Sequence, residues 1–101
     1  MKIDFSKNLK DFTNGKDIQE EGAPISLSTI SVRALLMHDE RTVKESGDKK
    51  LKDYQLAVKI HDAKEVELTA EEAARIKERI AMFFGTMVVG QAWPLLDGKE
   101  G

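Results

Sequence analysis

The feature that most constrains the fold is the segment from residue 69 to residue 87, which carries a helix start signal and a long amphipathic pattern. In Thr69-Ala70-Glu71-Glu72 the threonine hydroxyl and the Glu72 carboxylate can each accept a hydrogen bond from the other residue's backbone amide, which makes a capping box. Apolar residues then recur at spacings of three and four. They are Ala73, Ile76, Ile80, Phe83 and Met87. The pattern predicts a helix from about residue 70 to 85 that buries this stripe and ends or bends at Gly85.

The same helix places charged residues on the side opposite the apolar stripe. These residues are Glu71, Arg75, Glu78 and Arg79. We expect them to face solvent, where oppositely charged side chains three or four positions apart can pair. The neighbouring carboxylates of Glu71 and Glu72 point about 100° apart, so they suit the start of a helix better than acid–base chemistry.

The composition is that of a single globular domain. Of the 101 residues, 41% are apolar and 34% are charged, which leaves enough large apolar side chains for a core. The net charge of -2, with both signs interleaved, is not the basic footprint of a nucleic-acid-binding protein. The opening MKIDFSKNLKD lacks a signal-peptide core and no apolar run could span a bilayer, so we expect a cytoplasmic protein without a membrane partner.

A β-hairpin is predicted over about residues 2–20. Ile3 and Phe5 alternate with polar residues, and Asn14-Gly15 marks a turn. The segment 65–68 alternates in the same way and predicts a brief strand added to this hairpin. Residues 18–26 are interpreted as a polar connection broken by Gly22 and Pro24.

The register of the hairpin depends on the length of its loop. A two-residue turn at positions 14 and 15 would place Phe12 and Ile18 on opposite faces of the ribbon. A three-residue loop over 13–15, with Gly15 left-handed, pairs Phe12 with Lys16 and keeps Phe12 and Ile18 on one face. We favour the three-residue loop because it gathers the two large apolar side chains.

A helix is predicted from about residue 27, with Ser26 or Ser28 as its N-cap. Its apolar positions follow helical spacing. They are Leu27, Ile30, Ala34 and Leu35. The charged residues that follow, about 38–50, are interpreted as an exposed and solvated loop.

A second helix is predicted within residues 49–62, with an unusually broad apolar face. Five residues share one face of it, and Leu56 and Ile60 widen that face. The five are Leu51, Tyr54, Ala57, Val58 and His61. Such breadth predicts burial on two sides.

The uncharged run MVVGQAWPLL, residues 87–96, predicts a short amphipathic helix after Thr86 that closes at Asp97-Gly98. Its inward stripe follows helical spacing. The stripe is Val89, Ala92, Trp93 and Leu96. Pro94 lacks a backbone N–H, which predicts either a start as late as Gly90 or a kink. The expected fold is therefore α+β, a short N-terminal β-hairpin packed against three to four α-helices in one domain, 1–101.

No pattern of catalytic or ligand-binding residues stands out, and we expect neither enzymatic activity nor a cofactor or metal. His38-Asp39 and His61-Asp62 fall at predicted helix ends, where an imidazolium interacts favourably with the helix dipole. Without cysteine there is no thiolate nucleophile or cysteine-built zinc site. Neither a nucleophile elbow nor a phosphate-binding glycine loop occurs.

Two surfaces are candidates for binding. Phe84, Val88 and Trp93 form the candidate protein-binding set, because Phe83 and Phe84 cannot both face one core from a single helix and tryptophan is favoured at binding hot spots. We therefore expect a protein that binds a partner protein or itself. The alternative is a small nucleic-acid-binding regulator that contacts phosphates through a lysine-rich helix face. Its candidate residues are Lys49, Lys50, Lys52 and Lys59.

The C-terminal half resembles a group of small, poorly characterised proteins of tailed bacteriophages and prophages. The segments that carry the resemblance are KLKDYQLAVKI, EVELTAEEAARIKERI and VVGQAWPLLDG, of which VVGQAW is the most specific. The resemblance implies a non-enzymatic phage accessory or assembly protein acting in the cytoplasm of the bacterial host. It brings no catalytic residue, and the proline at position 94 departs from the pattern of the group.

Overall fold

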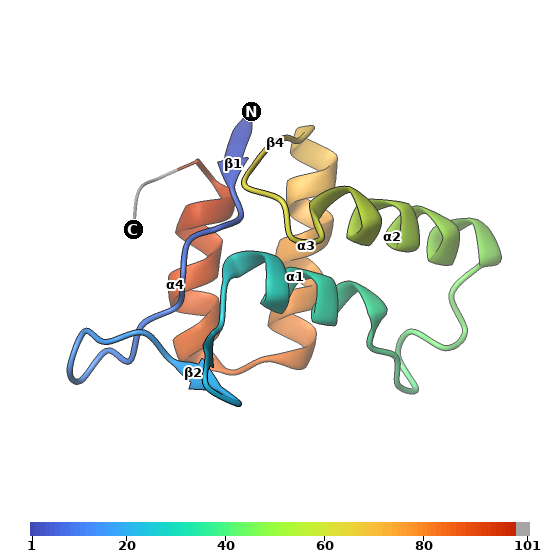
Figure 1. Ribbon diagram of the computed structural model, residues 1–101. Helices are drawn as coiled ribbons and strands as arrows, with labels where there is room; N and C mark the ends of the chain where they lie inside the picture. Colours follow the sequence, from blue (N-terminus) through green and yellow to red (C-terminus); the bar gives the residue numbers. More distant parts are fainter. Residues whose placement is uncertain (99–101) are drawn as a thin grey trace.

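Four helices and two short antiparallel ladders form residues 1–98, the part of the chain that the computed structural model describes (Figure 1). The elements are β1 (Lys2–Asp4), β2 (Gln19–Glu20), β3 (Ala23–Pro24), α1 (Leu27–Leu36), α2 (Gly47–Ile60), β4 (Glu65–Glu67), α3 (Ala70–Phe83) and α4 (Thr86–Leu96). Helix α1 packs against both α2 and α3, and α4 packs against α3. The predicted α+β class is confirmed, with α3 as the link between the two helix pairs.

Strand β1 pairs antiparallel with β4, with Ile3 opposite Val66. The predicted strand at 65–68 is thus confirmed, but it forms a two-stranded sheet with β1 and is not added to a hairpin. Ile3 and Phe5 point to the same side and are fully buried, as alternation along a strand requires. The N-terminus is tied to the start of α3 in this way, across more than sixty residues of sequence.

The turn at Asn14-Gly15 exists, and Gly15 has the predicted left-handed conformation, with φ of 72°. Its register differs from both predicted alternatives, because Lys10 lies opposite Asp17. The Asp11 carboxylate accepts hydrogen bonds from the Thr13 amide and hydroxyl, which folds a four-residue loop over 12–15. Phe12 therefore stands in the loop, 80% exposed, and the pairing of Phe12 with Lys16 was wrong.

The tight hairpin of this region lies instead at β2 and β3, in the segment interpreted as an irregular connection. Its two central residues, Glu21 and Gly22, both have positive φ, 52° and 81°. Positive φ at both positions is what a two-residue type I′ hairpin turn requires, because its twist matches that of the flanking strands. Here the prediction missed a turn in which a glutamate occupies the position that asparagine or aspartate usually takes.

Helix α1 begins as predicted, with the Ser26 hydroxyl accepting a hydrogen bond from the Thr29 amide at 3.2 Å. All four residues of its predicted apolar stripe are buried. Ser28 is not the cap. Its buried hydroxyl donates to the Ile60 carbonyl at 2.8 Å and accepts from the Asp62 amide at 3.0 Å, so it joins the start of α1 to the end of α2.

Helices α3 and α4 begin where the sequence predicts. The capping box at Thr69 and Glu72 has both of its hydrogen bonds, of 3.1 and 2.9 Å. Helix α4 runs unbroken from Thr86, so the proposed start at Gly90 was wrong, and Pro94 removes only the one bond that its missing N–H would donate. The predicted stripe of α4 faces inward. Its members are Ala92 and Leu96, both buried, and Val89 and Trp93, both half-buried.

The core lies between the helices and β1. Its largest fully buried side chains come from the N-terminal segment and from every helix. They include Ile3, Phe5, Leu9, Leu27, Ile60, Leu68, Ile76, Ile80 and Leu96. At roughly 1.5–3 kcal/mol for each large side chain removed from water, this burial is the main favourable contribution to folding.

Replacing Thr69 by alanine is expected to lower the free energy of unfolding by about 1 kcal/mol, because the Glu72 amide loses its partner. Denaturant unfolding followed by circular dichroism measures the change. Thr86→Ala is the matched control, since Thr86 begins α4 without capping it and the N-cap there is Gly85. Equal losses for the two variants would contradict the role of the capping box.

Candidate functional site

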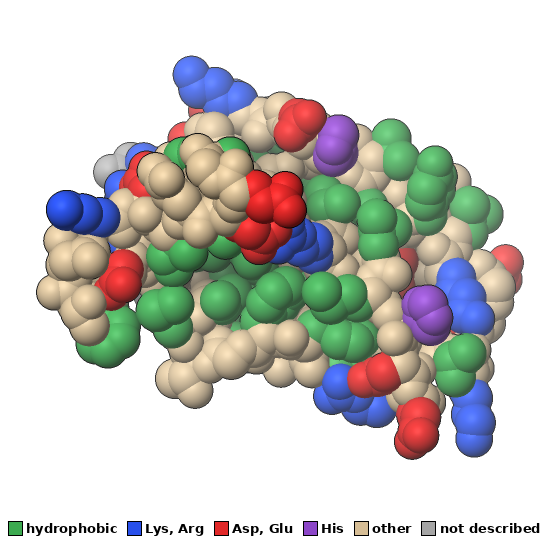
Figure 2. Space-filling model, turned by 60° about the horizontal axis from the view of Figure 1, so that its bottom comes forward, with side chains coloured by type: hydrophobic (Ala, Val, Ile, Leu, Met, Phe, Trp, Pro, Cys, Tyr) green, Lys and Arg blue, Asp and Glu red, His purple; other side chains and the backbone are tan. Residues whose placement is uncertain are grey.

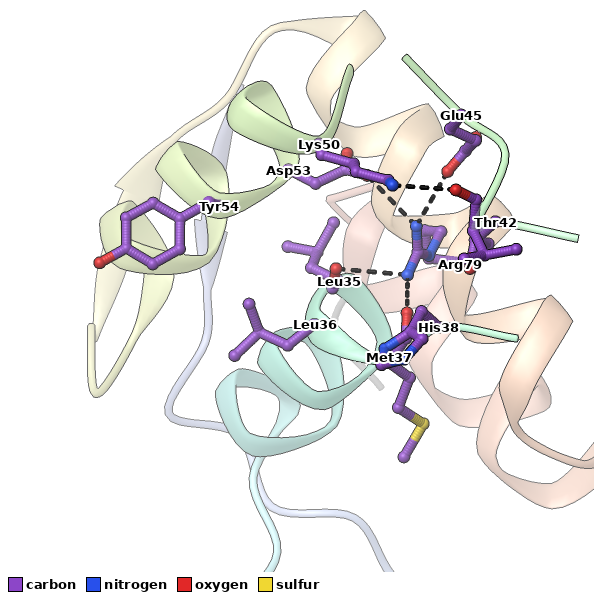
Figure 3. Close-up of a pocket in the computed structure, with 11 residues that line it drawn as sticks. Leu35, Leu36, Met37, His38, Thr42, Glu45, Lys50, Asp53, Tyr54 and Arg79 are labelled. Carbon is purple, nitrogen blue, oxygen red and sulfur yellow. Dashed lines mark hydrogen bonds and ion pairs between the residues drawn. The ribbon is translucent and has the colours of Figure 1, made fainter. Parts of the chain in front are cut away.

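Arg79 of α3 is a buried arginine, with 3% of its surface exposed. Its Nε donates to the Ala34 carbonyl at 2.9 Å, and its Nη2 donates to the carbonyls of Leu35, at 3.3 Å, and Met37. Carbonyls in the last turn of a helix have no partner within the helix. Arg79, on the neighbouring helix, therefore provides hydrogen-bond donors for the free carbonyls at the C-terminal end of α1, as Figure 3 shows.

Asp53 of α2 is equally buried, at 5% exposure, and two arginines surround it. Arg79 Nη1 lies 3.2 Å from its Oδ2, and Arg75 donates to both carboxylate oxygens at 2.9 and 2.7 Å. Glu45, in the loop before α2, accepts from Arg75 at 3.1 Å and from Arg79 at 3.4 Å. We call these four residues the ion network; it joins α1, α2, α3 and the loop between α1 and α2.

The electrostatics of the ion network balance burial against pairing. Burial lowers the pKa of the Arg79 guanidinium, and the charges of Asp53 and Glu45 oppose that shift. The hydrogen bonds that Arg75 donates to Asp53 raise the pKa of Arg75, and the hydrogen bond from Lys49, followed by that from Arg75, lowers the pKa of Glu45. An arginine stays protonated in proteins, so two positive charges face two negative ones.

The ion network leaves no free donor on Arg79. A guanidinium has five N–H groups, and Arg79 has five acceptors. They are the carbonyls of Ala34, Leu35 and Met37 and the carboxylates of Asp53 and Glu45. Binding an anion at Arg79 would require breaking one of these bonds, so the network is structural.

Three predictions fail at the ion network. Arg79 was expected on the solvent side of α3, whereas Glu71 and Glu78 do face solvent and Arg75 is half-buried. The loop of about 38–50 was expected to be solvated, yet Thr42 is buried in it and Glu45 is bound in the network. Pairing of opposite charges explains why Arg79 and Glu45 lie inward, because neither could be buried alone, whereas the Thr42 hydroxyl accepts a hydrogen bond from the Asp39 amide at 3.0 Å.

The third failure concerns the orientation of α2. The prediction is confirmed for Ala57, Leu56 and Ile60, which are buried, but burial on two sides was wrong, because the rest of the predicted face is exposed. The buried residues are Asp53, Leu56, Ala57 and Ile60. Because Asp53 pairs with Arg75 and Arg79, it faces the interior, and this sets which side of α2 is buried. Leu51, Tyr54 and Val58, which we call the α2 row, are left between 54% and 59% exposed.

The α2 row continues into a wider apolar surface. Three more large side chains beside it, at the end of α1 and in the following loop, are between 38% and 53% exposed. They are Leu36, Met37 and Val43. These six residues make up what we call the apolar surface. Figure 2 shows that hydrophobic side chains on the face brought forward lie among charges of both signs.

A groove of about 380 Å³ runs through this surface, between the end of α1, the following loop and α2. Leu36, Met37, Val43 and Tyr54 form its apolar rims. Its floor includes Asp53 and Arg79 of the ion network. In Figure 3, Leu36 of α1 and Tyr54 of α2 lie on the same side of the network. Because the floor is already saturated with hydrogen bonds, the surface that remains for a ligand is mainly apolar.

The predicted protein-binding residues lie elsewhere and are largely covered by their own domain. Phe84 and Val88 are half-buried and pack against the core. The Trp93 indole N–H donates to the Lys77 carbonyl at 3.1 Å, and the Lys77 ammonium lies 4.8 Å from the ring centre. Phe83 is half-buried between the guanidinium groups of Arg41 and Arg79. The covering that Phe84 needs thus comes from within the domain.

The predicted nucleic-acid-binding lysines are all exposed, but they do not form a free basic face. Lys49 pairs with Glu45 at 2.9 Å and Lys59 with Glu72 at 3.3 Å, while Lys50 donates to the Val43 carbonyl. Lys52 shares a depression between α2 and α3 with Lys49 and Lys59. The acidic residues of that depression are Asp53, Glu71 and Glu72. Carboxylates therefore interrupt the positive charge that a phosphate backbone would meet.

Both histidines are exposed, one just beyond the end of α1 and one at the end of α2 (Figure 2). His61 Nε2 lies 3.6 Å from the Asp62 carboxylate. Within residues 1–98 there is no group of three His, Cys, Asp or Glu side chains placed to hold a metal ion. No helix in the same range combines the length and the apolar character needed to cross a membrane.

Comparison of the chain with protein-family models, with curated proteins and with solved structures finds no match. What the fold and the site define is therefore a class: a small α+β domain with a buried ion network beneath an exposed apolar groove.

Replacing Arg79 by methionine is expected to lower the free energy of unfolding by about 3–5 kcal/mol, because three carbonyls at the end of α1 lose their donor and the buried Asp53 carboxylate loses one of its two arginines. Arg33→Met is the matched control. Arg33 pairs with Glu20 at the surface, and such a pair contributes at most about 1 kcal/mol. Thermal and denaturant unfolding compare the two variants. A similar, small loss for both would contradict a structural role for the network.

Proposed function

We propose that this protein is a non-enzymatic protein-binding domain and that the apolar surface around the groove is its binding surface. The observation that carries the proposal is the joint exposure of six large apolar side chains on adjoining elements. Scattered exposed apolar residues are ordinary, whereas a contiguous apolar patch rimmed by polar residues is typical of interaction sites. A protein partner would cover these side chains.

The chemistry around the groove supports protein binding over catalysis. Its polar floor is occupied by the ion network, in which Arg79 has no free donor for a substrate. The accessible side chains of its lining are mostly apolar, a tyrosine with leucine, methionine and valine, which bind by burying area, and the exposed His38 and Lys50 stand beside them. Tyr54 stands near the centre of the apolar surface, and tyrosine is among the residues that contribute most at interfaces.

The wider setting of the proposal is that of a phage accessory or assembly protein acting in the cytoplasm of a bacterial host. The similarity of the C-terminal half to small tailed-phage proteins supports this setting. Protein binding without catalysis is the activity that such a role requires. The earlier candidates Phe84, Val88 and Trp93 have a smaller part in it, because their own domain covers much of their surface.

A photo-crosslinking amino acid tests the proposal directly. With p-benzoylphenylalanine in place of Tyr54, irradiation of expressing bacteria is expected to give a discrete protein adduct on a denaturing gel. The same replacement at Phe12 is the matched control, since Phe12 is an exposed aromatic residue on a different element. Mass spectrometry of the adduct identifies the partner.

Two results would overturn the proposed binding surface. One is the absence of any adduct from position 54, in the presence of phage proteins as well as in their absence. The other is an identical set of adducts from positions 54 and 12, which would indicate random collision and not a site.

A further inference from the structure

We infer that the partner of the apolar surface is a second copy of this chain, with the two α2 helices packed antiparallel about a two-fold axis. This inference rests on the proposed function. It names the partner that would cover the apolar surface, which the domain itself leaves exposed. Three observations support it, namely the free side of α2, the spacing of its apolar row and the position of its charges.

The outer side of α2 is free to receive another helix. Leu56, Ala57 and Ile60 face the core, and α2 lies at the edge of the molecule in Figure 1, away from α4. Within residues 1–98, no other helix or strand covers the α2 row, whose three side chains are each more than half exposed. Helices packed directly against one another lie about 8–10 Å apart, which brings such side chains into contact.

The α2 row is self-complementary under a two-fold rotation. Leu51 and Val58 are equally far from a point between residues 54 and 55. An axis through that point places Leu51 of each copy opposite Val58 of the other, with the two Tyr54 rings at the centre. An interface of this kind uses the same patch on both copies, as closed dimers do. Leu36 and Val43 flank the row and extend the contact beyond a single helix pair.

The charges along α2 favour the antiparallel orientation. Asp48 and Lys59 are eleven residues apart, which at about 100° per residue places them on the same edge of the helix, one near each end. Antiparallel packing brings the Asp48 carboxylate of one copy near the Lys59 ammonium of the other, which also pairs with Glu72 of its own chain at 3.3 Å. Parallel packing would instead place Asp48 beside Asp48. Exposed ion pairs add little free energy, so their effect here is on orientation.

Single cysteines test this geometry without background, because the chain has no cysteine of its own. In the antiparallel pair, Gln55 lies next to the axis, so Gln55→Cys is expected to form a disulfide-linked dimer under mild oxidation of the purified full chain. Leu51→Cys and Val58→Cys are each expected to stay monomeric. At a rise of about 1.5 Å per residue, each of these positions is separated from its own symmetry mate by about 10 Å along the helix, beyond the reach of a disulfide.

An equimolar mixture of the Leu51→Cys and Val58→Cys proteins is expected to form a linked heterodimer, because the antiparallel pair places these two positions directly opposite each other. The mixture is the decisive sample, since an antiparallel pair alone brings these two positions together while keeping each from its own symmetry mate. Linking of all three single variants to the same extent would indicate collisions or a parallel pair, and would overturn the inference. So would the absence of linking in Gln55→Cys.

Sedimentation velocity provides the second measurement. The unmodified chain is expected to associate as concentration rises, and Val58→Lys is expected to raise the dissociation constant of the dimer at least about tenfold, because a charge would enter the apolar row. Phe12→Lys makes the same kind of change at another exposed apolar residue and is expected to leave association unchanged. A chain that stays monomeric at every concentration tested would overturn the inference.

The two proposals fail in different ways. If crosslinking from position 54 captures a different protein and the purified chain stays monomeric, the surface binds proteins but not a second copy. If position 54 gives no adduct and no cysteine variant links, the apolar surface is not a binding surface at all.

Discussion

The salt bridge between Arg79 and Asp53 is the interaction on which the arrangement of the helices depends. Arg79 closes the end of α1 and neutralises Asp53 on α2, while Arg75 holds the other side of the same carboxylate. A buried ion pair adds little net stability, because desolvation offsets much of the attraction. The effect of the pair is instead to favour one orientation of α2 over the others. A rotation of α2 that buried Leu51 and Val58 would remove Asp53 from both arginines and leave the buried Arg79 without its nearer carboxylate.

Features encoded within a few residues of sequence could be predicted. The capping box at Thr69, the N-cap at Ser26 and the start of α4 after Thr86 each depend on hydrogen bonds or periodicity inside one segment. Features that depend on partners elsewhere could not. The face of α2 depends on arginines more than twenty residues away, and the loop after Asp11 depends on a competing side-chain hydrogen bond.

The predicted binding residues and the exposed apolar surface lie on different elements. The uncharged run 87–96, which holds the only tryptophan of the sequence, is an obvious binding candidate. In the structure, however, α4 packs against its own domain, which covers much of this run. The exposed apolar residues lie instead on α2, among lysines and carboxylates that made the helix look like an ordinary solvated element. One signal was present in the sequence. Asp53 falls in helical spacing with Leu56, Ala57 and Ile60, and the spacing of Arg75 and Arg79 by four residues places both guanidinium groups on one side of α3.

The hydroxyl of Ser28 has a consequence for the rigidity of the groove. It fastens the first turn of α1 to the last turn of α2, while Arg79 fastens the last turn of α1 to the middle of α2. A helix held at both ends can neither slide nor pivot easily against its neighbour. The walls of the groove are thus preorganised, and a partner would not have to supply the conformational entropy of assembling them. Affinity at such a surface can come from a small contact area.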